Sequence, residues 1–156
     1  MLKGENIINA QDIYLRKFEA SDYHDYKKWF EDKELNKHLG PLDEDWLTYV
    51  MSDKTGEQFS FTHKQRLIGV AGTCFSDGDH DYQVLTDIAV RPDLRLRGIG
   101  MLLLTKLITS VKFERNTSWR AYVSPENKGA IQFFNKAGWH RLEHGLPEDG
   151  MMVFSL

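Results

Sequence analysis

Apolar and polar residues alternate at several places along the chain with the period of a β-strand. The first such run is IYLRKFEA, which starts at Ile13. Two more, EQFSFTH and RLIGVAGTCF, flank Lys64 and Gln65, which is the spacing of a two-residue hairpin. Further strands are predicted in YQVLTDIAV, in SWRAYVS and twice between His140 and Leu156, around an acidic turn.

Helical spacing of apolar residues predicts four helices. The first follows Ser21 and Asp22, which can cap it, and the second begins at the acidic residues 43–45. The third runs from about Gly98 to Phe113, and the fourth lies in PENKGAIQFFNKAGW, before Gly138. The order of strand, two helices, three strands, helix, strand, helix and two strands is typical of an α/β (α+β) fold with a mixed sheet.

Length and composition exclude several classes of protein. A chain of 156 residues has the usual size of one domain, so we expect a single domain over residues 1–156. Its 20 Lys and Arg against 23 Asp and Glu argue against binding to nucleic acid. Since neither a signal-peptide pattern nor a bilayer-spanning apolar run occurs, we expect a cytoplasmic protein with no membrane contact.

The residues that most often bind metals occur without the spacing of a metal site. The six histidines form no HxH or HExxH pattern, and the acidic run DGDHD lacks the rest of a calcium loop, so no metal is expected. The single cysteine, Cys74, has an apolar setting and is predicted to be a buried core thiol.

Three arginines and two glycines separate a predicted strand from a predicted helix in VRPDLRLRGIG, residues 90–100. The segment is not a GxxxxGK phosphate loop, and GxGxxG fails because Leu103 stands where the third glycine belongs. Unpaired N–H groups at a helix start bind anions, glycine lets the anion approach them, and arginine adds charge-assisted hydrogen bonds. The sequence therefore predicts an anion site here, with an ordinary basic turn as the alternative.

This segment resembles the acetyl-CoA pyrophosphate-binding motif of the GNAT superfamily of N-acetyltransferases, R/Q-x-x-G-x-G/A, through Arg95, Gly98 and Gly100. NKGAIQFFNKAGW is similar to the family's NxxAixlYeklGF helix, and LRKFEASD resembles the first strand of the ribosomal-protein and polyamine acetyltransferase branches. The resemblance covers nearly the whole chain. It implies the GNAT fold, a mixed, mostly antiparallel sheet of about seven strands with about four helices and a V-shaped splay between strands 4 and 5.

The resemblance also implies where acetyl-CoA binds. In the family, the backbone at the end of the fourth strand bonds the pantetheine arm, and one N–H there polarises the thioester carbonyl. Asn127 matches a position that commonly contacts this arm, although it could simply cap a helix. The implied cofactor-binding residues are Ile88, Ala89, Val90, Arg95, Leu96, Arg97, Gly98, Ile99, Gly100, Met101, Asn127, Ala130, Phe133, Phe134 and Lys136.

The implied reaction is direct attack of a primary amine on the acetyl thioester, without a covalent enzyme intermediate. Because an ammonium must first lose a proton, Asp87 is the candidate that binds or deprotonates the amine, unless it only bonds neighbouring groups. Phe134 stands where many members have a tyrosine that protonates the leaving thiolate. A water, Tyr122, Tyr82 or no acid would then serve, and the alternative is a catalytically silent domain that binds acetyl-CoA.

The acetyl acceptor is expected to be a small-molecule amine or a protein amino group. Acidic runs at 43–45, 77–81 and 143–149 would favour a cationic acceptor if two of them border the cleft, but charge runs are usually just solvated surface. The aromatic residues of the first two helices are expected to be mostly core. They are Tyr23, Tyr26, Trp29, Phe30, Trp46 and Tyr49. Dimers are common in the superfamily, so the chain is expected to be a monomer or a homodimer.

Overall fold

The computed structural model describes residues 7–75, 82–111, 118–144 and 146–156. Its strands are β1 (Ile13–Lys17), β2 (Gly56–His63), β3 (Arg66–Phe75), β4 (Tyr82–Val90), β5 (Ser118–Val123), β6 (His140–Arg141) and β7 (Met152–Ser155). Its α-helices are α1 (Tyr23–Trp29), α2 (Lys33–Leu39), α3 (Glu44–Ser52), α4 (Ile99–Ser110) and α5 (Lys128–Lys136). Within the described ranges, none of these helices has the length and apolar character needed to cross a membrane.

The strands form one mixed sheet in the order β1-β2-β3-β4-β5-β7-β6. Every neighbouring pair is antiparallel except β4 and β5, which run parallel. The parallel pairing starts at Tyr82–Ser118 and ends at Leu85–Ala121, although β4 continues to Val90. The strands thus part half-way along β4, which confirms the predicted splay between the fourth and fifth strands.

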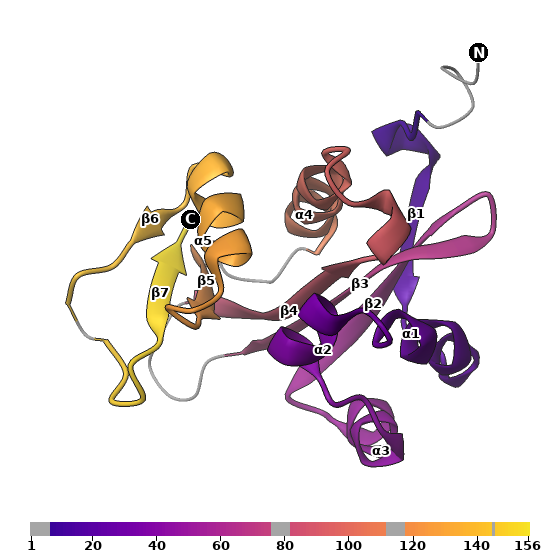
Figure 1. Cartoon of the computed structure of the whole chain (residues 1–156), viewed down its shortest axis with the longest axis horizontal. Coiled ribbons are helices and arrows are strands. Elements are labelled where there is room, and N and C mark those ends of the chain that lie inside the picture. The colour runs from indigo at the N-terminus through magenta and orange to yellow at the C-terminus, as the bar shows by residue number, and fades with distance from the viewer. Residues whose placement is uncertain (1–6, 76–81, 112–117, 145) are drawn as a thin grey trace.

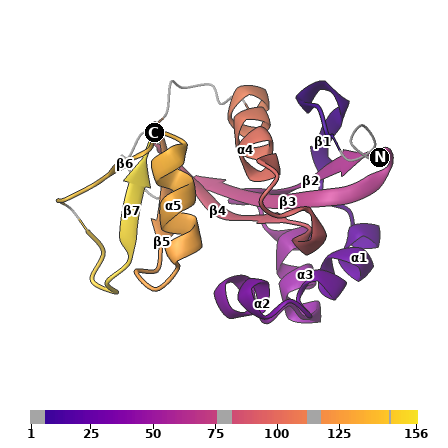
Figure 2. The same ribbon diagram turned by 45° about the horizontal axis from the view of Figure 1, so that its top comes forward.

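Helices cover both faces of the sheet, and each face has its own core. Figures 1 and 2 show α4 and α5 on one face and α1, α2 and α3 on the other. The α4/α5 core includes Leu103 and Leu107, whose exposure is 0%. The opposite core is rich in aromatic residues and contains Tyr26 and Trp29 of α1. Tyr23, Phe30 and Trp46 pack against this core, whereas Tyr49 is exposed, so the prediction that these aromatic residues are mostly core is confirmed.

Several predicted helix boundaries differ from the structure. Helix α2 was not predicted, because its seven residues bury only Leu35 and show little apolar periodicity. Helix α4 ends at Ser110 because Val111 is extended, three residues before the predicted end at Phe113, which lies outside the described residues. Helix α5 begins at Lys128 rather than near Pro125, because the residues before it form a turn.

The hairpin prediction holds, whereas two side-chain predictions were wrong. Lys64 and Gln65 have φ of 48° and 66°, the positive values of a two-residue hairpin turn. Asp22 precedes α1 but makes no side-chain cap for it, because its carboxylate accepts bonds from Arg16, Ser60 and the Glu19 N–H. Cys74 is only half-buried, since it lies near the exposed end of β3.

Candidate functional site

The glycine-rich loop between β4 and α4 leaves several backbone N–H groups open. Leu96 has φ of 62° and Gly98 has φ of 76°, so the chain turns sharply before the helix. Leu96 is fully exposed, so nothing it packs against explains the unfavourable backbone conformation. The first N–H groups of α4 have no partner within the helix, and the cap residue Gly98 provides no side-chain bond. The loop therefore presents a positive helix end to solvent, where an anion can bind.

The two motif glycines have different roles. A Cβ on Gly98 would meet no atom within 4 Å, so the space above its backbone is open and only the positive φ calls for glycine. A Cβ on Gly100 would lie 3.1 Å from Cε2 of Phe133 on α5. Gly100 therefore lets α4 and α5 pack closely. The sequence had instead suggested that glycine at this position serves the approach of an anion.

The three arginines of the loop are also not equivalent. Arg91 forms an ion pair with Asp93, with Nε 2.7 Å from Oδ1. Arg95 donates to Asp32 at 2.8 Å, and Asp32 in turn caps α2 by accepting from the Leu35 N–H. This hydrogen bond from Arg95 is the main cause that lowers the pKa of Asp32. Arg97 is exposed and has no ion pair among the described residues.

The last residues of β4 have one unpaired edge. Their other edge pairs with β3, and Arg91 N–H donates to Ile68 C=O at 2.9 Å. Antiparallel alternation then points the N–H and C=O groups of Ile88 and Val90 away from β3, to the side that β5 has left. Ala89 buries its side chain in the core on the face that α1, α2 and α3 cover. The open edge can thus accept an extended chain as an added strand.

A bulge on β4 directs two adjacent polar side chains to the same face. Gly72 pairs with Asp87 but Thr73 pairs with Leu85, so Thr86 is the extra residue. Gln58 Nε2 donates to Asp87 Oδ2 at 2.8 Å, and Thr86 Oγ1 donates to Oδ1 at 2.8 Å. A Cβ on Gly72 would come within 2.6 Å of all three side chains, at 2.4, 2.5 and 2.5 Å. Glycine at this position therefore gives the polar cluster its room.

The Asp87 carboxyl lies in a poorly solvated setting. Burial raises its pKa, while the hydrogen bonds from Gln58 and Thr86 oppose the shift without cancelling it. The charge of Asp87 also adds to the burial that raises the pKa of Tyr26 well above its ordinary value. Asp87 therefore faces the α1 side of the sheet, and its raised pKa makes it a better proton acceptor than an exposed carboxylate.

The α5 residues of the predicted site mostly do structural work in this fold. Asn127 caps the helix, with Oδ1 accepting from Ala130 N–H at 3.1 Å. Phe134 is 4% exposed and packs on Trp139 and Phe154, at centroid distances of 4.9 and 5.6 Å. Lys136 is exposed in the last turn. Phe134 thus belongs to the core of the α4/α5 face.

Three further side chains gather on β4 and β5, on the face opposite that core. The Arg120 guanidinium carbon lies 4.0 Å from the ring centroid of Tyr82. The Tyr122 hydroxyl interacts with both Tyr82 and Arg120. Burial and then the bond to Tyr82 raise the pKa of Tyr122, although Arg120 lowers it. We call Tyr82, Arg120 and Tyr122 the β4–β5 cluster.

The predicted acidic border of the site has no support in the described geometry. Residues 43–45 begin α3, where Asp43 caps the helix by accepting from the Trp46 N–H at 2.9 Å. Residues 77–81 lie outside the described part of the chain. The described residues between 143 and 149 form an irregular, mostly exposed segment.

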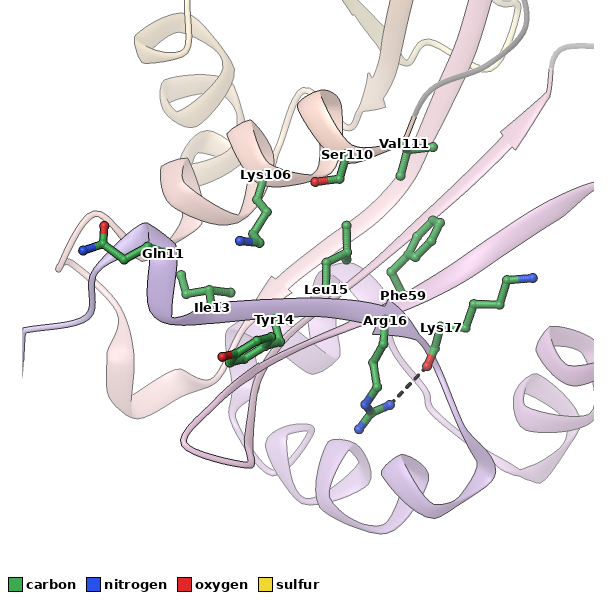
Figure 3. A pocket seen from close by; sticks show the side chains of 10 residues that line it. All are labelled: Gln11, Ile13, Tyr14, Leu15, Arg16, Lys17, Phe59, Lys106, Ser110 and Val111. Carbon is green, nitrogen blue, oxygen red and sulfur yellow. Dashed lines mark hydrogen bonds between the residues drawn. The ribbon is translucent and has the colours of Figure 1, made fainter.

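A cavity of about 500 Å³ lies away from these features, between β1 and α4. Figure 3 shows Lys106, Ser110 and Val111 on the helix side and Ile13 and Leu15 on the strand side. Strand β1 is the edge of the sheet farthest from β5, and none of the predicted site residues lines the cavity.

Sequence reasoning missed Asp32, Gln58, Gly72 and Arg120. Gly72 carried a usable signal, because an isolated glycine inside a strand suggests a bulge or a close approach. The others are polar residues of ordinary spacing, and only pairing between distant segments brings them to the site.

A model of the acetyltransferase (GNAT) family matches residues 12–139. The chain belongs to the acetyltransferase (GNAT) family. The predicted class, acetyl-CoA-dependent N-acetyltransferases, is thereby confirmed at the level of the family.

Relatives of this GNAT chain agree with the assignment. The uncharacterized N-acetyltransferase YfmK of Bacillus subtilis strain 168 is 25% identical over 130 residues, which are 82% of this chain and 85% of YfmK. The uncharacterized N-acetyltransferase MJ1207 of Methanocaldococcus jannaschii is 40% identical over 57 residues, 36% of this chain but only 25% of that relative's length. The crystal structure of spermidine N-acetyltransferase from Vibrio cholerae, with CoA and spermine, superposes with a TM-score of 0.72 at 16% identity, covering 93% and 94% of the two chains.

Proposed function

We propose that this GNAT chain transfers the acetyl group of acetyl-CoA to a primary amine by direct attack in a ternary complex. The observation that carries the proposal is the open edge of β4 at Ile88 and Val90, directly before unpaired N–H groups at the start of α4. An extended arm that ends in a pyrophosphate matches this arrangement, because the edge binds a strand-like chain and the helix start binds an anion.

The residues present fit acetyl-CoA. Unpaired N–H groups from Leu96 to Met101 would hold the pyrophosphate, with Arg97 as the exposed cation beside them. Gly98 leaves open space above its backbone, so the phosphate oxygens can approach. Arg95 would act through its bond to Asp32, which ties the loop to α2. The Ile88 and Val90 backbone groups would bond the pantetheine arm, and Asn127 would contact it only if it also keeps its capping bond.

Asp87 is the group we assign to the amine. Acetyl-CoA supplies the acetyl thioester; the carbon–nitrogen bond forms as the carbon–sulfur bond breaks. The ammonium proton passes to Asp87, directly or through a water, and the released thiolate takes up a proton. Gln58 and Thr86 fix both carboxylate oxygens, so they set its orientation. The bulge at Thr86 sets the face of the sheet to which Asp87 points. Asp87 lies two residues beyond Leu85, the last β4 residue that pairs with β5.

Phe134 does not protonate the thiolate, since it has no acidic proton and lies in the core. Tyr122 lies one residue beyond the last β4–β5 pair and is 37% exposed, so it is the tyrosine of the β4–β5 cluster at the fork. Its phenol is protonated at neutral pH and can donate, although burial raises its pKa and makes it a weaker acid than an exposed tyrosine. A water in its place would suffice, because the thiol of CoA is fairly acidic.

The test is thiol release from acetyl-CoA with a panel of amines, peptides and aminoglycosides, with acetyl-CoA affinity measured in parallel. Turnover on at least one amine, reduced in Asp87→Asn while acetyl-CoA affinity is kept, is the expected result. Thr105→Ala, an exposed change on α4, is the matched control and should alter neither quantity. Tight binding of acetyl-CoA without turnover on any acceptor would favour a silent binding domain instead.

A further inference from the structure

Arg120 differs from the other arginines that the structure describes. Arg16, Arg91 and Arg95 each pair with a carboxylate at 2.7 or 2.8 Å. The remaining described arginines, other than Arg120, are exposed to solvent, and they are Arg66, Arg97 and Arg141. Arg120 is half-buried, and no described carboxylate lies within ion-pair distance of it. Its Nε is buried without a hydrogen-bond acceptor.

A half-buried cation without a counter-ion is unfavourable, because part of its hydration is lost without a compensating charge. Here the guanidinium is held in one orientation. The guanidinium carbon lies 4.0 Å from the ring centroid of Tyr82, and Arg120 also interacts with the Tyr122 hydroxyl. A fixed planar guanidinium with unused donors suits a carboxylate, which it can bind through two parallel hydrogen bonds.

The β4–β5 cluster lies on the same face of the sheet as Asp87, the residue that we assign to the amine. Trp119, Ala121 and Val123 point into the α4/α5 core, so the alternate residues Arg120 and Tyr122 point to the opposite face. Asp87 also belongs to that face, since Ala89, two residues further along β4, packs against α1 residues while Ile88 packs in the α4/α5 core. Arg120 and Asp87 are thus on one face, on adjacent strands.

Their separation suits two ends of one small molecule. Arg120 pairs with Val84, and Asp87 is three residues further along β4. Because Thr86 is the extra residue of the bulge, Val84 and Asp87 pair with Cys74 and Gly72, which are only two residues apart on β3. At about 3.3 Å per residue this places the two backbone positions about 7 Å apart along the strand. An amine at Asp87 and a carboxylate at Arg120 would therefore be joined by a short aliphatic chain.

We propose that Arg120, oriented by Tyr82 and Tyr122, binds a carboxylate of the acetyl acceptor, so that the acceptor is an amine that also carries a carboxylate, as amino acids do. This inference rests on the proposed function and names the class of its acceptor. It differs from the cationic acceptor that the acidic runs of the sequence would favour.

The test compares a homologous series of ω-amino acids with alkylamines of matched chain length, in the same thiol-release assay. The full chain should prefer the carboxylated member of a pair by about ten- to hundred-fold in kcat/KM, because a charge-assisted bond in a partly dry site gives that discrimination. Arg120→Gln should bring the ratio close to one, and Arg120→Lys should restore part of it. Arg66→Gln, an exposed change in the β2–β3 hairpin, should keep the wild-type ratio.

Thermal melting of each variant separates loss of recognition from loss of the fold. A second variant, Tyr82→Leu, removes the stacking partner and should lower the ratio with Arg120 in place. Equal kcat/KM for the two members of every pair would overturn the inference and leave the proposed function standing, and so would an unchanged ratio in a folded Arg120→Gln. If no amine of either kind released thiol, the proposed function would fail and the inference with it.

Discussion

Gly98 offers the sharpest test of anion binding at the start of α4. Its φ of 76° is tolerated by asparagine and aspartate better than by other side chains, at a cost of about 1 kcal/mol. A Cβ there meets no atom within 4 Å, so the first atom of either side chain has open space. Gly98→Asn and Gly98→Asp therefore have nearly the same size and backbone strain, and they differ by one negative charge.

The charge alone should separate their affinities for acetyl-CoA. Two unit charges about 6 Å apart, at an effective dielectric constant of about 20, repel by about 3 kcal/mol, or roughly a hundred-fold in Kd. Screening by salt at this exposed position reduces the ratio toward about ten-fold. A carboxylate at a helix N-terminus is itself favourable by about 0.3–1 kcal/mol, so the aspartate variant should be at least as stable as the asparagine variant.

Calorimetric titration with acetyl-CoA measures both Kd values, and the ratio should shrink as salt is added. Gly138 provides a matched control pair, because it has φ of 81°, open space around it and a place at the far end of α5. Gly138→Asn and Gly138→Asp should bind acetyl-CoA equally. Equal affinities for the two Gly98 variants would refute an anion site at this helix start.

Three other predictions concern stability. Burial raises the pKa of Asp87, so the folded chain loses stability as the pH rises through the acid range. Asp87→Asn should therefore melt at the same or a higher temperature than the wild type at pH 7. A lower melting temperature would contradict this. For Asp22, burial raises the pKa, but bonds from Arg16 and others outweigh it and lower the pKa, so stability is lost as the pH falls below about 4. Asp22→Asn should cost about 1–3 kcal/mol in urea unfolding at pH 7, and a difference that persisted in full at pH 2 would count against the explanation. Leu107→Ala, at a position with 0% exposure, should cost about 3–5 kcal/mol, against at most about 0.5 for the exposed Thr105→Ala.

Local patterns in the sequence determined much of the fold. The alternation in RLIGVAGTCF, the two-residue spacing at Lys64 and Gln65, and the apolar face around Leu107 each depend on neighbours within one element, so the strand, the turn and the helix were predictable. The loop at Gly98 was predictable for the same reason, since a positive φ and a helix start are both local. Helix α2 was not predicted, because seven residues with one buried leucine show too little apolar periodicity.

Tertiary structure alone decided which side chains meet. Gln58, Gly72 and Asp87 come from three strands, and a bulge of one residue at Thr86 sets their register, which no spacing along the chain encodes. Asp32 reaches Arg95 across 63 positions of sequence. Sequence by itself thus determined most of the elements and the turn at Gly98 before α4, because these follow from short-range sterics and periodicity. The setting of Asp87, and that of Arg120, which pairs with no carboxylate among the described residues, depend on burial and strand pairing, which exist only after the chain has folded.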